Sequence, residues 1–135
     1  MNDQRCVVIL NQQLSAGKAA NAAAVIALTL GQRHPQFVGA GLIAADQREY
    51  PGLIPVGIPV LAASDQQLSE LRSQCDAQQL DIVLFPVEGQ QTTDYAAFRA
   101  AVSLIPSPDL QLLGLAVTGD KKVLRKLTAK LKLFG

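Results

Sequence analysis

Four short apolar runs recur along the chain and alternate with longer segments of mixed polarity. The runs are Cys6–Leu10, Val60–Ala62, Asp81–Phe85 and Leu112–Val117. Continuous stretches of Val, Ile and Leu at this length are typical of strands buried on both faces, as in a parallel sheet. Because segments with helical periodicity separate the runs, the pattern predicts a three-layer α/β/α domain around a mostly parallel sheet of these four strands.

Helices are predicted between and after these strands. We expect them over 19–30, 65–78, from 93–94 to 102, and from 121 to about 129. The first is rich in alanine, which favours helix and permits close packing, and Gly31 is expected to end it. Ser64 and Gln67 have the spacing of a capping box at the start of the second helix. Thr93-Asp94 is expected to start the third helix, and Gly119-Asp120 is expected to cap the last one.

The segment from Gln32 to Pro59 has no regular period and is rich in Gly and Pro. Within it, Leu42-Ile43 and Arg48–Tyr50 flank Asp46-Gln47, so a small hairpin is expected. Connections of this length often line functional sites. The simpler alternative is a hairpin insertion that only covers the sheet.

Composition is that of a globular protein. The 135 residues fit one domain, 1–135, with 49% hydrophobic and 17% charged residues. Cys6 and Cys75 are far apart and both stand at apolar positions, so they are expected to be buried thiols in a reducing compartment. The longest apolar stretch, Ala19–Leu30, is shorter than the roughly 20 residues that cross a bilayer. We therefore expect a cytoplasmic protein without a membrane span.

The turn between the first strand and the first helix is the strongest candidate for a binding site. It runs from Asn11 to Lys18 and brings Gly17 and Lys18 to the start of the helix. Free backbone N–H groups, the positive end of the helix dipole and an ammonium group together favour an anion. The turn is not a P-loop, since Gln12 stands where that motif has glycine and Ala19 supplies no hydroxyl group.

The sequence has no other common motif for a cofactor, a metal or a catalytic nucleophile. No G-x-G-x-x-G fingerprint follows a strand, which removes the usual dinucleotide site. The single histidine, His34, and two separated cysteines do not make a zinc site of ordinary spacing. His34 stands just past a helix end, where satisfying backbone carbonyl groups is a more common role than catalysis. We expect no metal and no cofactor.

Basic residues are concentrated at the C-terminal end, although the net charge is only +1. Half of them lie in the last fifteen positions, namely Lys121, Lys122, Arg125, Lys126, Lys130 and Lys132. The lysines at 122, 126 and 130 step by four along one face of the expected helix, while apolar residues follow another face. This segment is either a docked helix with a solvated charged face or a stripe that tracks the phosphates of RNA.

Three stretches taken together resemble the class II peptidyl-tRNA hydrolases. They are Val7-Val-Ile-Leu with Leu14-Ser-Ala-Gly17-Lys18-Ala-Ala, Val60-Leu-Ala-Ala-Ser-Asp-Gln-Gln-Leu68, and Gly119-Asp-Lys-Lys-Val-Leu-Arg-Lys-Leu-Thr128-Ala-Lys-Leu-Lys-Leu133. The whole chain, including Leu30-Gly-Gln-Arg-His-Pro35 and Tyr50-Pro-Gly-Leu53, is similar to an uncharacterised bacterial family with this fold. The resemblance implies a mixed four-stranded sheet between helices, often a homodimer, and cleavage of the ester that joins a peptide to tRNA.

The resemblance also implies roles for individual residues. Lys18 matches the lysine of the G-K-x-A-A-Q motif, whereas Ala22 and Val25 stand where glutamine and histidine occur farther along it. Glu88-Gly89 with Thr92 corresponds to the family's D-A-G-x-T after the third strand. In such a site Lys18 would stabilise developing negative charge and Glu88 would act as a base for water.

Three functions follow as alternatives. The first is an unassigned activity at an anion or carbonyl site, the second an active peptidyl-tRNA or related ester hydrolase, and the third a ligand- or RNA-binding module without turnover. A small molecule or a tRNA-like substrate is the expected partner, and the small-residue helix together with the resemblance predicts a homodimer. The residues expected to bind the ligand are Asn11, Gly17, Asn21 and Thr92.

Overall fold

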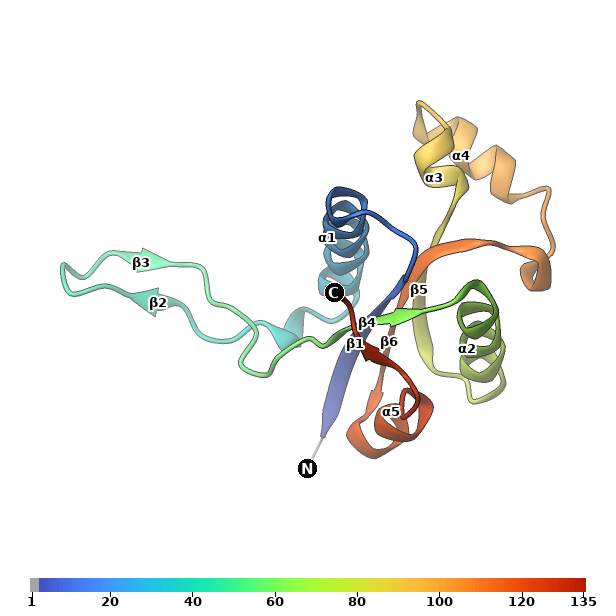
Figure 1. Ribbon diagram of the computed structural model, residues 1–135. Helices are drawn as coiled ribbons and strands as arrows, with labels where there is room; N and C mark the ends of the chain where they lie inside the picture. The colour runs from blue at the N-terminus through green and yellow to red at the C-terminus, as the bar shows by residue number, and fades with distance from the viewer. Residues whose placement is uncertain (1–2) are drawn as a thin grey trace.

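The computed structural model describes residues 3–135, and its centre is a mixed five-stranded sheet (Figure 1). The strands are β1 (Gln4–Asn11), β4 (Val60–Ala63), β5 (Asp81–Pro86), β6 (Leu112–Asp120) and β7 (Lys132–Leu133). Their order across the sheet is β5-β6-β1-β4-β7. Strands β1 and β4 pair in parallel, whereas β1 with β6, β5 with β6, and β4 with β7 are antiparallel.

The four expected strands belong to one sheet, as predicted, but the expected four-stranded and mostly parallel arrangement is corrected. A continuous apolar run reports burial on both faces of a strand and carries no information on its direction. Strand β6 is buried at eight of its nine positions and yet runs against both of its neighbours. The fifth strand, β7, is two exposed residues long and had no signal that a sequence pattern could detect.

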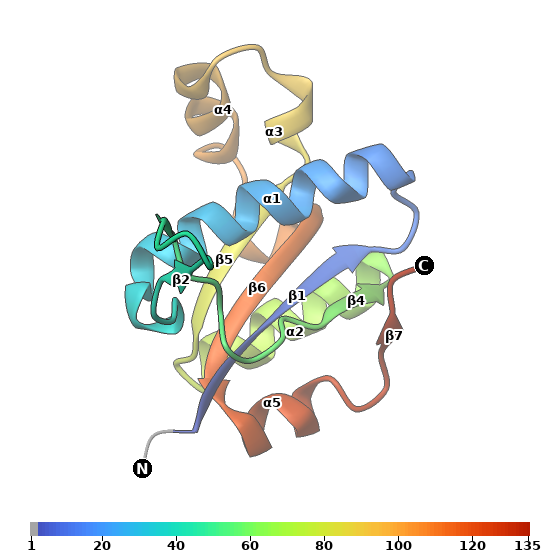
Figure 2. The same ribbon diagram turned by 90° about the vertical axis from the view of Figure 1, so that its left-hand side faces the viewer.

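Helices lie on both faces of this sheet (Figure 2). They are α1 (Ala16–Arg33) on one face, and α2 (Asp65–Ala77) and α5 (Lys121–Leu127) on the other. Alternate residues of β1 supply the two cores, because successive side chains of a strand point to opposite faces. Val8 and Leu10 pack with α1, whereas Val7 and Ile9 pack with α2 and α5.

Small residues allow α1 to lie close to the sheet. Ala19 and Ala22 are buried. Gly114 of β6 has no room for a side chain, because a Cβ atom there would lie 2.7 Å from the carbonyl oxygen of Ile9 and 3.3 Å from Cδ1 of Ile26. The buried alanines therefore serve packing within the chain, and the predicted homodimer needs a different surface to support it.

The ends of α1 differ from the prediction. The helix begins at Ala16, three residues early, and ends at Arg33 with Gly31 inside it. The backbone N–H of His34 still donates to the carbonyl oxygen of Leu30 at 2.9 Å, and Pro35 follows. Proline, and not the expected glycine, therefore marks the end of the helix.

The structure adds short helices that were not expected. A short helix, α3 (Glu88–Gln91), precedes the expected helix α4 (Tyr95–Val102). Two 3-10 helices, η1 (Pro35–Phe37) and η2 (Ser107–Asp109), follow α1 and α4. The Asp94 carboxylate caps α4 and the Asp120 carboxylate caps α5, as predicted. Because α5 ends at Leu127, Lys130 lies in the turn before β7, and the expected lysine stripe is not carried by one helix.

Residues 38–57 form a hairpin, called here the arm, that stands away from the sheet (Figure 1). Its strands, β2 (Leu42–Ile43) and β3 (Glu49–Tyr50), pair antiparallel as expected, and Gln47 in the turn has a φ of 71°. Every residue from 40 to 51 is exposed. The tip of this insertion therefore does not cover the sheet as the simpler alternative expected, whereas Phe37, Ile54 and Ile58 at its two ends pack against the core on the α1 side.

Cys6 and Cys75 are buried free thiols, as predicted. Burial raises the pKa of Cys6, and burial together with the neighbouring charge of Asp76 raises the pKa of Cys75 to about 11. Within residues 3–135, no helix has both the length and the apolar character needed to cross a membrane. The cytoplasmic location stays a prediction.

Candidate functional site

A cavity of about 340 Å³ lies between α1 and the segment that follows β5, and we call it the α1–α3 pocket. It is lined by Asn21, Val25, Phe85, Gly89, Thr92, Thr93, Asp94, Tyr95 and Phe98. Its volume is within the range of small-molecule sites, about 300 to 1,000 Å³. Strands β1 and β5 point the same way and end at this edge of the sheet. The pocket thus occupies the place where α/β proteins commonly bind ligands.

Aromatic rings form much of the wall of the pocket. Phe85, the residue before the last of β5, is only 8% exposed. The rings of Tyr95 and Phe98 are tilted against each other with centroids 5.8 Å apart. A Cβ atom at Gly89 would lie 2.2 Å from Cε1 of Phe85, so glycine is required for α3 to rest on that ring. The wall suits a planar or acyl group.

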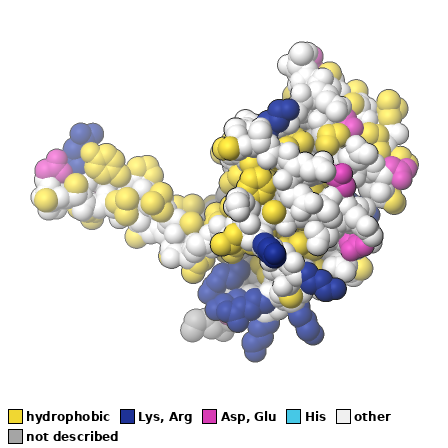
Figure 3. Space-filling view, viewed as in Figure 1, with side chains coloured by type: hydrophobic (Ala, Val, Ile, Leu, Met, Phe, Trp, Pro, Cys, Tyr) yellow, Lys and Arg dark blue, Asp and Glu magenta, His cyan; other side chains and the backbone are white. Residues whose placement is uncertain are grey.

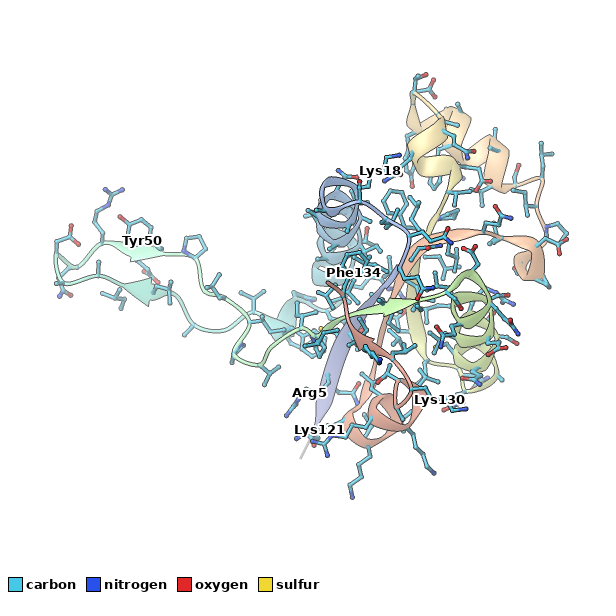
Figure 4. The ribbon with its side chains drawn as sticks, in the orientation of Figure 1. Arg5, Lys18, Tyr50, Lys121, Lys130 and Phe134 are labelled. Atoms are coloured by element: carbon cyan, nitrogen blue, oxygen red, sulfur yellow. The ribbon has the colours of Figure 1, made fainter. Side chains whose placement is uncertain are left out.

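The polar edge of the pocket is supplied by α1. Lys18, Asn21 and Val25 have the spacing i, i+3, i+7 and therefore share one helix face. Figure 4 shows Lys18 at the start of α1 on the side toward α3 and α4. The side chain of Ser15, the N-cap residue, accepts no hydrogen bond, and the first turn has no acidic residue. Within residues 3–135, no carboxylate lies within ion-pair distance of Lys18.

Glu88 stands next to the pocket at the start of α3. Its Oε1 atom is buried and has no hydrogen-bond partner within the described residues. A buried carboxylate oxygen without a donor is uncommon in a folded protein, because desolvation without a compensating bond is unfavourable. The backbone carbonyl of Glu88 is engaged, since it accepts from the N–H of Thr92 at 3.1 Å and from its hydroxyl at 2.8 Å.

The structure places the expected site residues differently. Asn21 and Thr92, from distant parts of the sequence, line the same pocket, although the Thr92 hydroxyl is used to close α3. Lys18 and Glu88 flank the pocket without lining it. Gly17 is exposed and a Cβ atom there would touch nothing, so its backbone needs no glycine.

Asn11 is held in a structural role. Its Nδ2 donates to Oδ1 of Asp65 at 2.6 Å and to the carbonyl oxygen of Leu112 at 3.4 Å. Its Oδ1 accepts from the backbone N–H of Gln13 at 3.0 Å. Asn11 is 8% exposed and is not among the residues that line the pocket. These bonds tie the end of β1 to β6 and α2.

His34 lies at the opposite end of α1, in a cluster with Asp81 and Arg33. Nε2 of His34 and Nη2 of Arg33 each lie 2.5 Å from an oxygen of Asp81. The Arg33 hydrogen bond, followed by that of His34, holds the pKa of Asp81 below its ordinary value, against the opposing effect of burial. The cluster fixes the end of α1 to the start of β5. Among residues 3–135, no three His, Cys, Asp or Glu side chains are grouped so that they could hold a metal ion.

A second cavity, of about 380 Å³, lies at the other edge of the sheet, and we call it the basal groove. Its apolar floor includes Val7, Leu61 and Leu124, its rim has Arg5, Lys121 and Arg125, and the foot of the arm borders it through Val56 and Gly57. Figure 3 shows basic side chains gathered over this end of the molecule. No carboxylate of residues 3–135 lies within ion-pair distance of Lys121 or Arg125.

Comparison with known proteins places the chain in a family. Residues 4–134 match the family described as a protein of unknown function, DUF2000. The chain belongs to the DUF2000 family. Among solved structures, it is similar to a protein of unknown function, Atu0240, from Agrobacterium tumefaciens str. C58, with 22% identity, a TM-score of 0.91 and full coverage of both chains. That likeness shows the fold alone. No curated protein matched.

For this DUF2000 member, the expected similarity to an uncharacterised family is confirmed. The resemblance to peptidyl-tRNA hydrolases is a separate matter, and these matches do not support it. Sequence reasoning also missed the aromatic wall of the α1–α3 pocket. The chain has only four Phe and two Tyr, and Phe85, Tyr95 and Phe98 come together there. The i, i+3 spacing of Tyr95 and Phe98 in an aromatic-poor chain is the signal that was available.

Proposed function

We propose that this DUF2000 domain binds a small molecule in the α1–α3 pocket, and that the molecule has a flat or acyl body and an anionic or carbonyl group. The observation that carries the proposal is the convergence of Asn21 from α1 and Thr92 from the segment after β5 on one cavity. The aromatic wall takes the apolar body of the ligand. The Asn21 amide offers both a donor and an acceptor at the edge.

Charge gives the ligand its orientation. The first turn of α1 has free N–H groups and the positive end of an 18-residue helix, with the Lys18 ammonium group beside them. A carboxylate, a phosphate or the oxygen of a polarised carbonyl group placed there would be stabilised. The ligand therefore extends from the rings of Phe98 and Tyr95 toward Lys18.

Ester hydrolysis is the more specific form of this proposal. Glu88 would accept a proton from a water molecule whose oxygen attacks the acyl carbon, and Lys18 would stabilise the resulting oxyanion. Collapse of the tetrahedral intermediate would break the bond to the leaving oxygen, which takes the proton back from Glu88. The products are an acid and an alcohol, as in cleavage of a peptidyl-tRNA or a small acyl ester.

Two positions argue against efficient cleavage of peptidyl-tRNA itself. Ala22 stands where the resembled motif has glutamine, and it is fully buried against the sheet. Val25 stands where that motif has histidine, and it lines the pocket with an apolar side chain. We therefore expect peptidyl-tRNA cleavage to be weak or absent, and a small ligand is the preferred partner.

Binding is tested by titration with inorganic phosphate, benzoate and 3-phenylpropionate, followed by NMR of the backbone amides. We expect 3-phenylpropionate to shift amides of both α1 and α4, and phosphate to shift those of α1. Lys18→Ala should weaken binding by about 1 kcal/mol, or about fivefold, as for one charge-assisted hydrogen bond. Lys130→Ala is the matched control, because Lys130 lies at the basal end (Figure 4). No shifts at α1 and α4 would overturn the proposal.

Turnover is tested separately from binding. Activated aryl esters of 3-phenylpropionate and an acetyl-aminoacyl-tRNA are the substrates. Hydrolysis that is lost in Glu88→Gln while 3-phenylpropionate still binds identifies an enzyme. Binding without hydrolysis, unchanged in Glu88→Gln, identifies a binding module.

A polyanion such as RNA at the basal end is a second candidate. Seven of the twelve Lys and Arg residues belong to β1, α5 and the segment that follows α5. They gather at one end of the molecule (Figure 3). Single-stranded RNA binding should then fall steeply with salt, and Lys122→Ala with Lys126→Ala should reduce the slope. A flat salt response would exclude it.

A further inference from the structure

The arm carries an apolar surface that has no partner in its own chain. Its exposed large side chains are Val38 (53%), Leu42 (50%), Ile43 (66%), Tyr50 (44%) and Leu53 (70%). Figure 3 shows this apolar surface running along the arm. Large contiguous apolar patches are rare on the surface of soluble monomers, and where they occur they mark interaction sites.

The arm is nevertheless a formed ladder. The N–H of Gly39 donates to the carbonyl oxygen of Leu53 at 2.8 Å near the foot, and that of Ala44 donates to Arg48 at 2.9 Å near the tip. At Gly52 a Cβ atom would lie 2.2 Å from the carbonyl oxygen of Gly39, so the two sides of the arm touch. A two-stranded hairpin is at best marginally stable by itself in water. A partner that covers its apolar side chains would therefore stabilise the arm.

We propose that the arm docks on a second copy of this chain, with its tip in the partner's basal groove. Charge supports this occupant: the tip carries Asp46 and Glu49, whereas the rim of the groove carries Lys121 and Arg125 beside Arg5, which is paired with Asp3 at 2.9 Å. Arg48, the one basic residue of the tip, packs over the ring of Tyr50 with a distance of 5.4 Å to the centroid. The tip is thus acidic and apolar, and the groove is basic and apolar.

The position of the groove makes the docking reciprocal. The groove is bordered by Val56 and Gly57, at the foot of the chain's own arm. Two arms that lie side by side in opposite directions about a two-fold axis place each tip at the foot of the other arm. A two-fold interface of this kind is self-complementary and closed, so it ends at a dimer.

The size of the arm is adequate for such an interface. Stable protein interfaces use about 20 to 30 residues from each side, and the arm extends over residues 38–57. Leu42 and Tyr50 are directly opposed across the hairpin and therefore share one face. That face matches the floor of the groove formed by Val7, Leu61 and Leu124.

Sedimentation velocity from low micromolar to near-millimolar concentration gives the first test. We expect a species of twice 14.3 kDa that dissociates on dilution. Leu42→Asp should weaken association at least tenfold, as for an interface residue at the centre of a contact. Leu104→Asp is the control, since Leu104 is 84% exposed and lies outside the arm. A monomer at all concentrations, or equal effects of the two substitutions, would overturn the proposal.

Charge reversal tests where the tip docks. Glu49→Lys and Lys121→Glu should each weaken association, and the double variant should recover most of the loss. Circular dichroism checks that each variant is folded. If the double variant is weaker than both single variants, the tip does not contact the basal groove. If RNA or an anionic amphiphile occupies the groove of a monomeric protein, the proposal is likewise overturned.

Disulfide trapping gives a readout that does not depend on affinity. Asp46→Cys and Lys121→Cys are prepared as separate proteins and mixed under mild oxidation. The native thiols Cys6 and Cys75 are buried and should not compete. A covalent dimer that forms only in the mixture supports the exchange of arms, and its absence in a sample that sediments as a dimer overturns it.

Discussion

Two turns lead from parallel strands into helices, and each has a serine at the N-cap, but only one of the two helix starts is capped by its own chain. Strands β1 and β4 lie side by side and lead into α1 and α2, each through a serine N-cap in extended conformation. The Ser64 hydroxyl accepts from the backbone N–H of Gln67, and the side-chain Oε1 of Gln67 accepts from the backbone N–H of Ser64. Asp65 lies in the first turn of α2. Ser15 makes no such bond, and α1 has Lys18 in its first turn.

The difference suggests separate roles for the two helix starts, one in stability and one in binding. At α2 the chain satisfies its own N–H groups and balances the helix dipole with a carboxylate, which is the arrangement that favours folding. At α1 the same groups are left open, and a lysine adds to the positive potential. This uncompensated helix start, beside an aromatic-lined cavity, is the basis of the proposal that the pocket binds an anion.

The largest effect is expected from Asn11, which links the two turns. Asn11→Ala removes the donor to Asp65 and Leu112 and leaves the N–H of Gln13 without its partner. Because these groups are at least partly buried, we expect a loss of about 1 to 3 kcal/mol in the free energy of unfolding. Urea denaturation measures it. Asn21→Ala, at an exposed position of α1, should change stability by less than about 0.5 kcal/mol.

The sequence predicted the positions of the main strands better than it predicted their directions or the edge strand β7. The strands were identified because successive residues of one strand, such as Val8 and Ile9, are buried on opposite faces of the sheet and leave continuous apolar runs. Caps at Ser64, Asp94 and Asp120 were identified because a single side chain contact determines them. Strand direction and β7 were not, because both depend on pairing with distant strands.

The candidate site shows the same division. Lys18 and Asn21 could be chosen because they follow a strand and open a helix, a purely local pattern. The spacing of Tyr95 and Phe98 was a local signal, but their meeting with Phe85 and α1 was not, because it depends on how α3 and α4 fold over the end of β5. The extension of the arm away from the sheet was also beyond the sequence, since Leu42 and Ile43 resemble core residues and are exposed.

The second prediction compares the two serines directly. Ser64→Ala should lower the free energy of unfolding by about 1 kcal/mol, the usual value of an N-cap in a capping box. Ser15→Ala should change it by less than about 0.5 kcal/mol, since no cap bond exists to be lost. Both are measured by urea denaturation. Equal losses would show that the start of α1 is capped in solution and would remove the contrast between the turns.

The third prediction concerns the charge at the start of α1. Lys18→Glu should stabilise the protein by about 0.3 to 1 kcal/mol, because a carboxylate suits the positive end of the helix dipole. The same change should abolish the binding of phosphate and 3-phenylpropionate. Thermal unfolding and NMR titration are run on the same sample. A variant that gains stability and still binds both anions would contradict a site at Lys18.

The smallest effect is expected at the far end of α1, where the helix is held by an ion pair. The hydrogen bond from Arg33, and then that from His34, hold the pKa of Asp81 below its ordinary value of 3.8, with burial opposing. A carboxyl group with a lowered pKa stabilises the folded state at pH values above its unfolded pKa. That contribution is lost as the pH falls through the folded pKa.

The unfolding temperature of the unmodified protein should therefore fall more steeply below about pH 4 than that of Asp81→Asn, which has no charge to lose at this position. Arg33→Ala should lower the acid dependence more than His34→Ala does, because the Arg33 bond is the larger cause. Asp65→Asn, at the start of α2, serves as a comparison for a carboxylate of the other turn. If Asp81→Asn keeps the full acid dependence, the cluster does not hold the end of α1, and the two ends of that helix differ less than the contacts indicate.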